Sequence, residues 1–328
     1  MQPNSQATTT PVPGPQTAWE DAAWRMMLAA ARLSRDPAFD ATRVSRLPAA
    51  EVPETVSCGF EFDLLWHPDC GWGFDPQPDF EPFRSLAELY SPLCAPVLGG
   101  CEVHAHLGQS LDACVATARG DSCYVTGPEN LRHLHRMRAL CDAVLVGTET
   151  AACDDPRLTT RLVEGDNPVR VILDRNRRLP AGLGVFHDGA AETWLVCSEA
   201  ASRDQGPEPV LGRVVGVPAR DDRLDLTALV ERLADLGVGR LFIEGGGTTV
   251  SAFLCRGLVH HLQIAVSALL IGAGRPGLVP PQSGRLCEAL RPRTRIYRMG
   301  KDVLYDMDMT APNGGESQDD QVGLARIG

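Results

Sequence analysis

The segment GRLFIEGGGTTVSAFL, residues 239–254, decides the fold class. Its first half is an apolar strand that ends on Glu244, and three glycines then turn the chain into a helix that starts at Thr248 or Thr249. This order is typical of an α/β sheet. Free N–H groups at such a helix start suit a pyrophosphate, whereas a tight turn with a threonine cap explains the same residues without a ligand. Both interpretations stay open from this segment alone.

Strand-like and helix-like segments alternate on both sides of this segment, from about residue 99 onward, at intervals suited to an α/β sheet. Strands are predicted within 101–117 and at 143–147, 167–174, 192–197, 239–245, 293–300 and 303–309, and helices at 127–143, 225–238 and 249–259. The inner face of the first of these helices is predicted to comprise Leu131, Leu134, Met137, Ala139 and Leu140. The region 99–310 is therefore expected to form one α/β domain.

The remaining parts of the chain differ from this domain in composition and in hydrophobic periodicity. Residues 1–18 and 311–328 are polar and are predicted to be disordered tails. Residues 19–98 are predicted to be a small accessory region. It starts with a helix near residues 19–33 and continues with irregular structure and a short strand within 57–66.

Composition excludes several classes of protein. The chain has 328 residues and a net charge of −11, which argues against a partner that is a nucleic acid. The apolar run at 262–272 is too short to span a membrane, and the N-terminus lacks the features of a secretory signal, so a cytoplasmic protein is predicted. The 11 cysteines include no C-x-x-C pair, and no metal site is predicted.

Charged residues mark a possible ligand site. Glu244 follows a strand of the predicted sheet, at the edge where ligands usually bind in open α/β sheets. Arg138 and Arg161 come from separate segments and could converge on a phosphate, and Arg175 follows a strand in a basic loop that could reach a 2′-phosphate. Ser122 could offer a hydroxyl to an oxyanion. Taken singly, each of these residues is also compatible with a solvated surface position.

Four segments, taken together and in this order, resemble a known family. They are LGQSLDACVATARGDSCYVTG (107–127), the region 133–161 with its D-D-P-x-L-T-x-R motif, NPVRVILD (167–174) and the region around E-G-G-x-T from 242 onward. They resemble the reductase domain of bacterial riboflavin-biosynthesis deaminase–reductases, the pyrimidine reductase family, over about residues 99–310. The resemblance implies a dihydrofolate-reductase-like α/β fold with a central, mostly parallel sheet, an antiparallel C-terminal edge and flanking helices. A small irregular N-terminal region would precede this fold, and the protein would be a homodimer.

The resemblance also implies an activity. Members of the family reduce 5-amino-6-(5-phosphoribosylamino)uracil to the ribitylamino product with NADPH, by hydride transfer to ribose C1. The first hundred residues carry neither half of a zinc-deaminase signature, so no deaminase activity is predicted. Two alternatives stay open: a paralogue that reduces another phosphorylated or heterocyclic substrate, and a nucleotide-binding protein without catalysis.

The resemblance assigns roles residue by residue. Glu244 and His106 would be catalytic. The substrate would contact Ser122, Arg138, Leu158, Arg161 and Glu244. NADPH would contact Gly108, Tyr124, Thr150, Asp154, Arg175, Gly246, Gly247, Thr248, Thr249, Val250, Ser251 and Ala252. His106 stands where the family usually shows lysine, and would be a weaker, pH-dependent donor. Ala113 and Cys114 stand where the family usually shows glycine and a basic residue.

Overall fold

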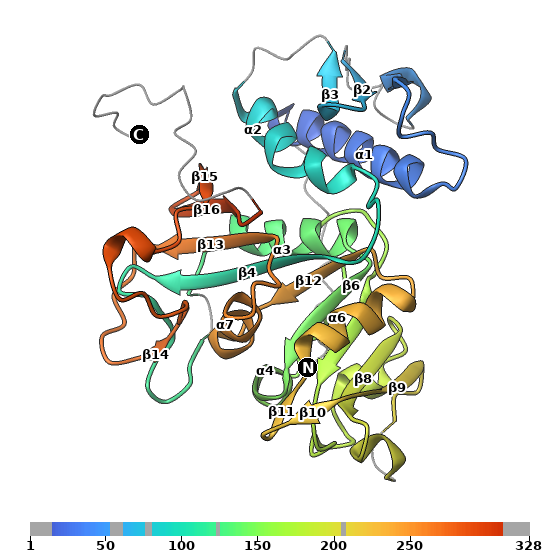
Figure 1. Ribbon diagram of the computed structural model, residues 1–328. Helices are drawn as coiled ribbons and strands as arrows, with labels where there is room; N and C mark the ends of the chain where they lie inside the picture. The colour runs from blue at the N-terminus through green and yellow to red at the C-terminus, as the bar shows by residue number, and fades with distance from the viewer. Residues whose placement is uncertain (1–14, 53–61, 76–80, 123–124, 205–207, 311–328) are drawn as a thin grey trace, which may run out of the picture. The chain divides into compact units, whose positions relative to one another are not determined.

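The computed structural model describes residues 15–52, 62–75, 81–122, 125–204 and 208–310 (Figure 1). The chain divides into two compact units, Met1–Pro96 and Val97–Gly328, which are described separately. Residues 1–14 of the N-terminal tail predicted at 1–18, and the C-terminal tail predicted at 311–328, lie outside the described residues. Residues 15–18 belong to a helix, so the predicted N-terminal tail extends too far.

The first unit is more regular than the sequence suggests. Helix α1 (Pro15–Arg35) and helix α2 (Glu81–Tyr90) accompany an antiparallel sheet of three strands in the order β1-β2-β3. The strands are β1 (Ser45–Leu47), β2 (Asp63–His67) and β3 (Gly71–Asp75). Aromatic side chains form much of its core, and the indole N–H of Trp72 donates to Ser34 Oγ at 2.8 Å. The irregular structure expected after the first helix is therefore wrong for the described part of this unit.

The second unit is built on a sheet of nine strands in the order β15-β16-β13-β4-β12-β6-β7-β8-β9. The strands are β4 (Glu102–Ser110), β6 (Ala143–Gly147), β7 (Val169–Leu173), β8 (Thr193–Ser198), β9 (Gly212–Val217), β12 (Arg240–Glu244), β13 (His261–Ser267), β15 (Arg293–Met299) and β16 (Asp302–Asp308). Neighbours from β13 to β9 pair in parallel, and β16 pairs antiparallel with both β13 and β15. The predicted mostly parallel sheet with an antiparallel C-terminal edge is confirmed.

The main helices connect parallel strands and cover both faces of this sheet (Figure 1). They are α3 (Pro128–Leu140), α6 (Leu226–Asp235) and α7 (Gly247–Leu254), with two shorter helices, α4 (Thr148–Asp154) and α5 (Gly184–His187). Pro128 opens α3 and the Asp225 carboxylate caps α6 through the N–H groups of Thr227 and Ala228. Right-handed crossovers place α3 on one face and α6 and α7 on the other.

The two faces differ in polarity. On the face covered by α6 and α7, the core includes Val103, Leu145, Leu241, Leu229 and Phe253, which are all fully or almost fully buried. On the α3 face, by contrast, the sheet presents His106 and Gln263, and α3 turns Asn130 and His133 toward them. The predicted inner face of α3 is therefore only partly correct, since Leu131 is 38% exposed.

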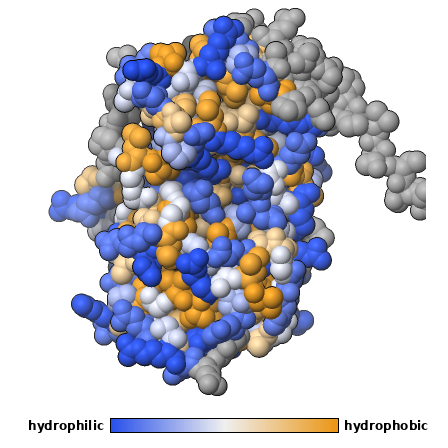
Figure 2. Space-filling view, turned by 90° about the vertical axis from the view of Figure 1, so that its right-hand side faces the viewer, coloured by the Kyte–Doolittle hydropathy of each residue, from blue (hydrophilic) through white to orange (hydrophobic). Residues whose placement is uncertain are grey.

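Small elements complete the second unit. Strand β5 (Cys114–Ala116) pairs with β14 (Arg275–Pro276), and β10 (Ala219–Arg220) pairs with β11 (Arg223–Leu224). Short 3₁₀ segments occur at Ala49–Glu51, Ser91–Cys94, Ala201–Arg203 and Leu286–Glu288. Within the residues that the structure describes, no helix has the length and apolar composition needed to cross a membrane. On the face shown in Figure 2, apolar side chains form small groups separated by hydrophilic ones.

Candidate active site

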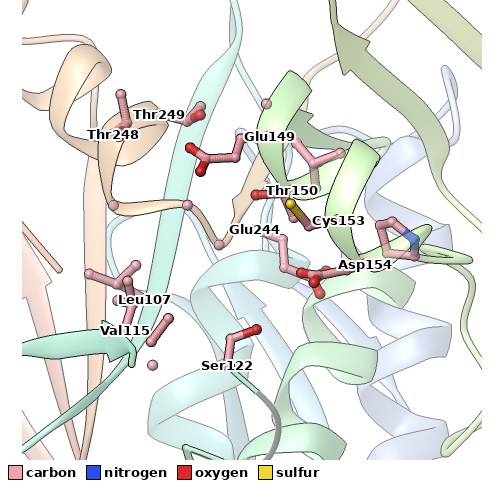
Figure 3. A pocket seen from close by; sticks show the side chains of 18 of the residues that line it. Leu107, Val115, Ser122, Glu149, Thr150, Cys153, Asp154, Glu244, Thr248 and Thr249 are labelled. Atoms are coloured by element: carbon pink, nitrogen blue, oxygen red, sulfur yellow. The ribbon is translucent and has the colours of Figure 1, made fainter. Parts of the chain in front are cut away.

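A cavity of about 890 Å³ opens at the carboxyl ends of β4, β12 and β6. These three strands are adjacent and parallel, so their carboxyl ends meet at one edge in the middle of the sheet. The chain passes from β4 through α3 to β6 on one side and returns through β12 to β13 on the other, which makes this edge a place where strand order reverses. Figure 3 shows side chains from β4, β12, α4 and α7 directed into the cavity.

One wall is the glycine turn between β12 and α7. Gly245 and Gly246 have φ angles of 70° and 67°, which favour glycine. A Cβ atom on Gly247 would lie 1.9 Å from the carbonyl oxygen of Gly277, so the backbone of residues 276–277 touches the helix start. Gly245 to Thr249 all line the cavity, and the first N–H groups of α7 lack partners within the helix. The observed start at Gly247 comes one or two residues before the predicted start at Thr248 or Thr249.

Glu244 lies at the end of β12, directly opposite His106 in the register of β4. Its carboxylate accepts two hydrogen bonds from Arg138, one from Nε at 2.7 Å and one from Nη2. Arg138 also donates to the carbonyl oxygen of Thr159 at 2.9 Å. The side chains of Arg138 and Glu244 are only 7% and 14% exposed. Arg138 therefore fixes the orientation of Glu244 and does not itself line the cavity.

A group of positive charges lies on the segment that follows α4. Partial burial, together with Arg138 and Arg157, lowers the pKa of Arg161. His135 of α3 holds this segment, because its Nδ1 atom accepts from the backbone N–H of Arg161 at 2.8 Å. Burial lowers the pKa of His135 to about 4, so the imidazole is neutral and can accept at pH 7. Arg138 is neutralised by Glu244, whereas Arg157 and Arg161 are exposed cations on this segment.

Leu158 lies between these two arginines and lines the cavity. It is 1% exposed and has a φ angle of 53°, a left-handed conformation that is rare for a leucine. The preceding Asp155 also has a positive φ, of 38°, and its carboxylate accepts from the N–H of Gly184. Strained backbone of this kind is often retained where it positions functional groups. This turn directs Leu158 inward and keeps Arg157 and Arg161 outside.

His106 is buried at the end of the cavity that faces α3. Its Nε2–H donates to Asn130 Oδ1 at 3.0 Å, since the amide of Asn130 donates in turn to Thr126 Oγ1 at 2.9 Å. Burial lowers the pKa of His106 to about 4, although Glu244 opposes this shift. The imidazole is therefore neutral at pH 7. It can donate a hydrogen bond, but its charge does not change near neutral pH.

The turn after β4 has a left-handed backbone conformation at Ala113, where the family usually shows glycine. Ala113 has a φ angle of 60°. Asp112 accepts from Ser110 Oγ and from the N–H groups of Ile271 and Gly272, and these bonds lower its pKa to about 2. Cys114 is buried, with its thiol near the carbonyl oxygens of Asp112 and Gly272. The bonds that Asp112 accepts fix the turn.

Most of the predicted site residues meet at this cavity. Those on its wall are His106, Gly108, Ser122, Thr150, Asp154, Leu158, Glu244, Gly246, Gly247, Thr248 and Thr249. Burial raises the pKa of Asp154. Tyr124 lies outside the described residues. Thr148–Asp154, part of this wall, form helix α4, which is absent from the helices predicted from the sequence.

Six predicted residues do not reach the wall. Arg138 and Arg161 lie behind and beside it, as described above. Arg175 forms an ion pair with Asp222. Val250 is fully buried in the core and Ala252 packs against that core. Ser251 joins α7 to the following loop, since its hydroxyl donates to Gly247 O and accepts from the N–H of Val279. These last three residues therefore support the helix from inside.

Sequence reasoning missed several lining residues, among them Asn130, Glu149, Cys153 and Arg275. Asn130 is the one with a detectable signal, a polar residue at the inner spacing of a predicted helix. Arg275 lies in a Gly- and Pro-rich segment with no periodicity, and only the pairing of β14 with β5 brings it to the cavity. No group of three His, Cys, Asp or Glu side chains able to hold a metal ion occurs in the described part of the chain.

The shape and chemistry of the cavity suit a dinucleotide together with a small polar substrate. Its volume is at the upper end of the range for ligand sites. The glycine turn allows close approach of a diphosphate to backbone N–H groups. A Cβ atom on Gly108 would lie 3.0 Å from the Thr126 side chain, and one on Gly147 would lie 2.5 Å from Thr249 Oγ1. Glycine at these two positions therefore keeps the walls closely packed.

Comparisons with known proteins agree with this architecture. Residues 102–305 match the family described as the RibD C-terminal domain. The chain is 36% identical over 203 residues to the 2,5-diamino-6-ribosylamino-4(3H)-pyrimidinone 5′-phosphate reductase of Methanothermobacter thermautotrophicus, covering 60% of this chain and 93% of that protein. It is 32% identical over 213 residues to the riboflavin biosynthesis protein RibD of Escherichia coli K12, covering 60% of this chain and 57% of RibD. The chain thus spans little more than half of that RibD relative.

Solved structures give the same result. A deaminase/5-amino-6-(5-phosphoribosylamino)uracil reductase from Thermotoga maritima superposes with a TM-score of 0.55 at 25% identity, covering 70% of this chain and 61% of that chain. The riboflavin biosynthesis reductase Rib7 from Saccharomyces cerevisiae superposes with a TM-score of 0.51 at 21% identity, covering 64% of this chain and 90% of that chain. At that identity, the second likeness supports the fold alone.

Proposed function

The chain belongs to the family of the RibD C-terminal domain, and we propose that it reduces 5-amino-6-(5-phosphoribosylamino)uracil to the ribitylamino product with NADPH. The chain is thus a pyrimidine reductase of riboflavin biosynthesis by family. The observation that carries the specific proposal is the orientation of Glu244, which lines the cavity opposite His106 and is held from behind by Arg138. It provides an oriented carboxylate between a glycine turn suited to a diphosphate and two arginines suited to a phosphate.

Each group has a defined task under this proposal. Arg157 and Arg161 hold the phosphate of the substrate by charge-assisted hydrogen bonds. Glu244, held by Arg138, accepts hydrogen bonds from the substrate and orients it. His106 and Asn130 form a neutral polar wall, and Leu158 excludes water from the reacting centre. The glycine turn and Thr150 hold the cofactor, which supplies the hydride that ribose C1 accepts.

A second candidate substrate is favoured by one comparison. The Methanothermobacter relative, 93% of which is covered, is named for a diaminopyrimidinone phosphate, a substrate that still carries the 2-amino group. The two compounds share the ribosyl phosphate and the reacting carbon, so the roles of Arg161 and Glu244 would be the same for both. The order of deamination and reduction would differ. Use of NADPH, a cytoplasmic location and a homodimer remain predictions, and light scattering checks the last of these.

The test is a coupled measurement of turnover and product. Purified protein is incubated with NADPH and either pyrimidine, and oxidation is followed at the absorbance band of reduced nicotinamide. A product heavier than the substrate by two hydrogens, seen by mass spectrometry, supports the proposal and identifies the preferred pyrimidine. NADPH binding without oxidation in the presence of either compound would overturn it and favour the non-catalytic alternative.

The same assay tests the phosphate site. Replacing Arg161 with alanine is expected to raise KM by about 10- to 100-fold, since charge-assisted bonds to a phosphate are lost, while the affinity for NADPH changes little. Arg178→Ala, which removes the same charge from an exposed position in another loop, is the matched control. An unchanged KM for Arg161→Ala would remove this arginine from the substrate site.

A further inference from the structure

An ion pair joins two walls of the candidate active-site cavity. Arg275 of β14 and Glu149 of α4 approach at 2.6 Å between Nη1 and Oε1. Both residues line the cavity, although they belong to segments 126 residues apart in the sequence. Their side chains are 45% and 69% exposed, so the pair is reached directly by solvent and by any ligand that enters.

Arg275 differs in sign from the other ionised side chains on the cavity wall. Among the described residues that line the cavity, the acids are Glu149, Asp154 and Glu244, and Arg275 is the single arginine or lysine. Arg138 already neutralises Glu244 from behind. An anionic ligand inside the cavity would therefore find one cation on the wall, and that cation is engaged by Glu149.

Arg275 lies beside the glycine turn. The next two residues, Pro276 and Gly277, are the ones whose carbonyl oxygens approach Gly247 at the start of α7. In Figure 3, Glu149 lies on the side of Thr248 and Thr249 and away from Ser122. The guanidinium of Arg275 also lies close to Gly120, where a Cβ atom would be 3.1 Å from its Nη2 atom. Because Gly120 has no side chain, the guanidinium of Arg275 can lie against the backbone there.

An exposed ion pair of this kind is easily exchanged. Water screens the attraction between the two charges, and both side chains lose rotamer freedom when they pair. A phosphate group offers more acceptor oxygens and a geometry that matches the guanidinium fork. Exchange of a carboxylate for a phosphate on Arg275 is therefore favourable, and the released Glu149 can turn to solvent.

We propose that Arg275 binds a phosphate of the ligand, and that Glu149 is its counter-ion only until that phosphate displaces it. This assignment rests on the proposed function. The position of Arg275 beside α7 favours the diphosphate of the cofactor, because the substrate phosphate has its own cations in Arg157 and Arg161. Glu149 then acts as a competitor of the cofactor, and removing it strengthens binding.

The test compares four proteins: the unaltered chain, Arg275→Gln, Glu149→Gln and the double variant. The dissociation constant of NADPH is measured by nicotinamide fluorescence without substrate. Arg275→Gln is expected to weaken binding about tenfold or more, and Glu149→Gln to tighten it by about threefold to tenfold. In the double variant, the gain from Glu149→Gln is expected to disappear. Equal weakening by both single variants, or no change in either, would show a purely structural ion pair and overturn the proposal.

Two further arms separate the sources of the phosphate. Reduced nicotinamide riboside carries no phosphate, so its affinity should respond little to Arg275→Gln. A rise in the KM of the pyrimidine with unchanged NADPH affinity would instead assign Arg275 to the substrate and overturn the cofactor assignment. Failure of the unaltered chain to bind NADPH would overturn the proposed cofactor and this assignment together. Normal binding with unresponsive variants would overturn the exchange alone.

Discussion

At the scale of single residues, Ala113 shows how this chain keeps a turn whose usual residue it lacks. Its φ of 60° is easily adopted by glycine. For alanine this conformation costs roughly 1 kcal/mol or more, because Cβ approaches the following carbonyl oxygen. Asp112 holds the conformation through bonds to Ser110, Ile271 and Gly272. The turn therefore survives the substitution, and the strain is stored in the loop that carries β5 to the cavity.

Replacing Ala113 with glycine is expected to stabilise the protein by about 0.5–1 kcal/mol. Relief of the strain in the folded state outweighs the extra conformational entropy that glycine gives the unfolded chain and that folding must remove. Thermal unfolding measures this as a rise in Tm. The control is Ala152→Gly on the exposed side of α4, where the same change is expected to cost about 1 kcal/mol. A fall in Tm for Ala113→Gly would mean that its positive φ is not strained.

Predicting the site residue by residue worked where a motif fixes both identity and position. Glu244 and the glycine turn are of this kind, because a strand end and a helix start define where they lie. The motif does not tell where the side chain of Arg138 points: it lies behind Glu244 and does not line the cavity. Arg275 was missed because its position depends on the pairing of β14 with β5, which leaves no periodic signal.

At the scale of elements, the contact of α7 with residues 276–277 sets the geometry of the glycine turn. An alanine at position 247 would place Cβ 1.9 Å from Gly277 O and 2.9 Å from Pro276 O. These are backbone atoms, so the segment carrying Arg275 would have to move. We expect Gly247→Ala to weaken NADPH binding by about tenfold or more and to lower stability by roughly 1–3 kcal/mol.

Fluorescence titration and thermal unfolding measure both effects in the same preparation. Gly182→Ala is the control, because no atom lies within 4 Å of its added Cβ and its φ is ordinary. It is expected to change neither NADPH affinity nor, by more than about 1 kcal/mol, stability. An affinity within twofold of the unaltered chain for Gly247→Ala would show that the contact with residues 276–277 does not shape the cofactor site.

The elements themselves followed from the hydrophobic pattern where strands are buried on both faces or a helix is long enough to show one apolar side. Strands β6, β7, β8 and β12 and helices α3 and α6 lie at their predicted places. Helix α4 was not predicted, because seven residues are too few for a periodic pattern. The inner face of α3 was misjudged for a different reason. Asn130 and His133 turn inward because the facing strands offer His106 and Gln263 as partners, and pairing across the sheet is not visible in the helix sequence alone.

At the scale of the whole molecule, an acidic chain contains a set of buried neutral histidines. Burial lowers the pKa to about 4 for His104, His106 and His135 and to about 3 for His133, and it also lowers the pKa of His261. Two effects of acidification therefore oppose one another. Protonation reduces the net charge of −11 and relieves self-repulsion, whereas each buried histidine resists protonation in the folded state.

We expect the histidines to decide the outcome between pH 6.5 and 4. Their folded pKa values lie below the ordinary value of about 6.5, so the unfolded chain binds more protons in this window. Stability is then fully present above pH 6.5 and falls as pH drops toward 4, by up to about 1.4 kcal/mol per pH unit for each buried histidine. NMR of labelled histidines checks the cause, since the imidazoles of His104, His106, His133 and His135 should keep their neutral shifts below pH 5. Urea unfolding at several pH values checks the slope. His133→Asn should reduce the slope by about one proton, and His187→Asn at an exposed position is the control. A stability that rises on acidification would mean that relief of the negative charge outweighs the buried histidines.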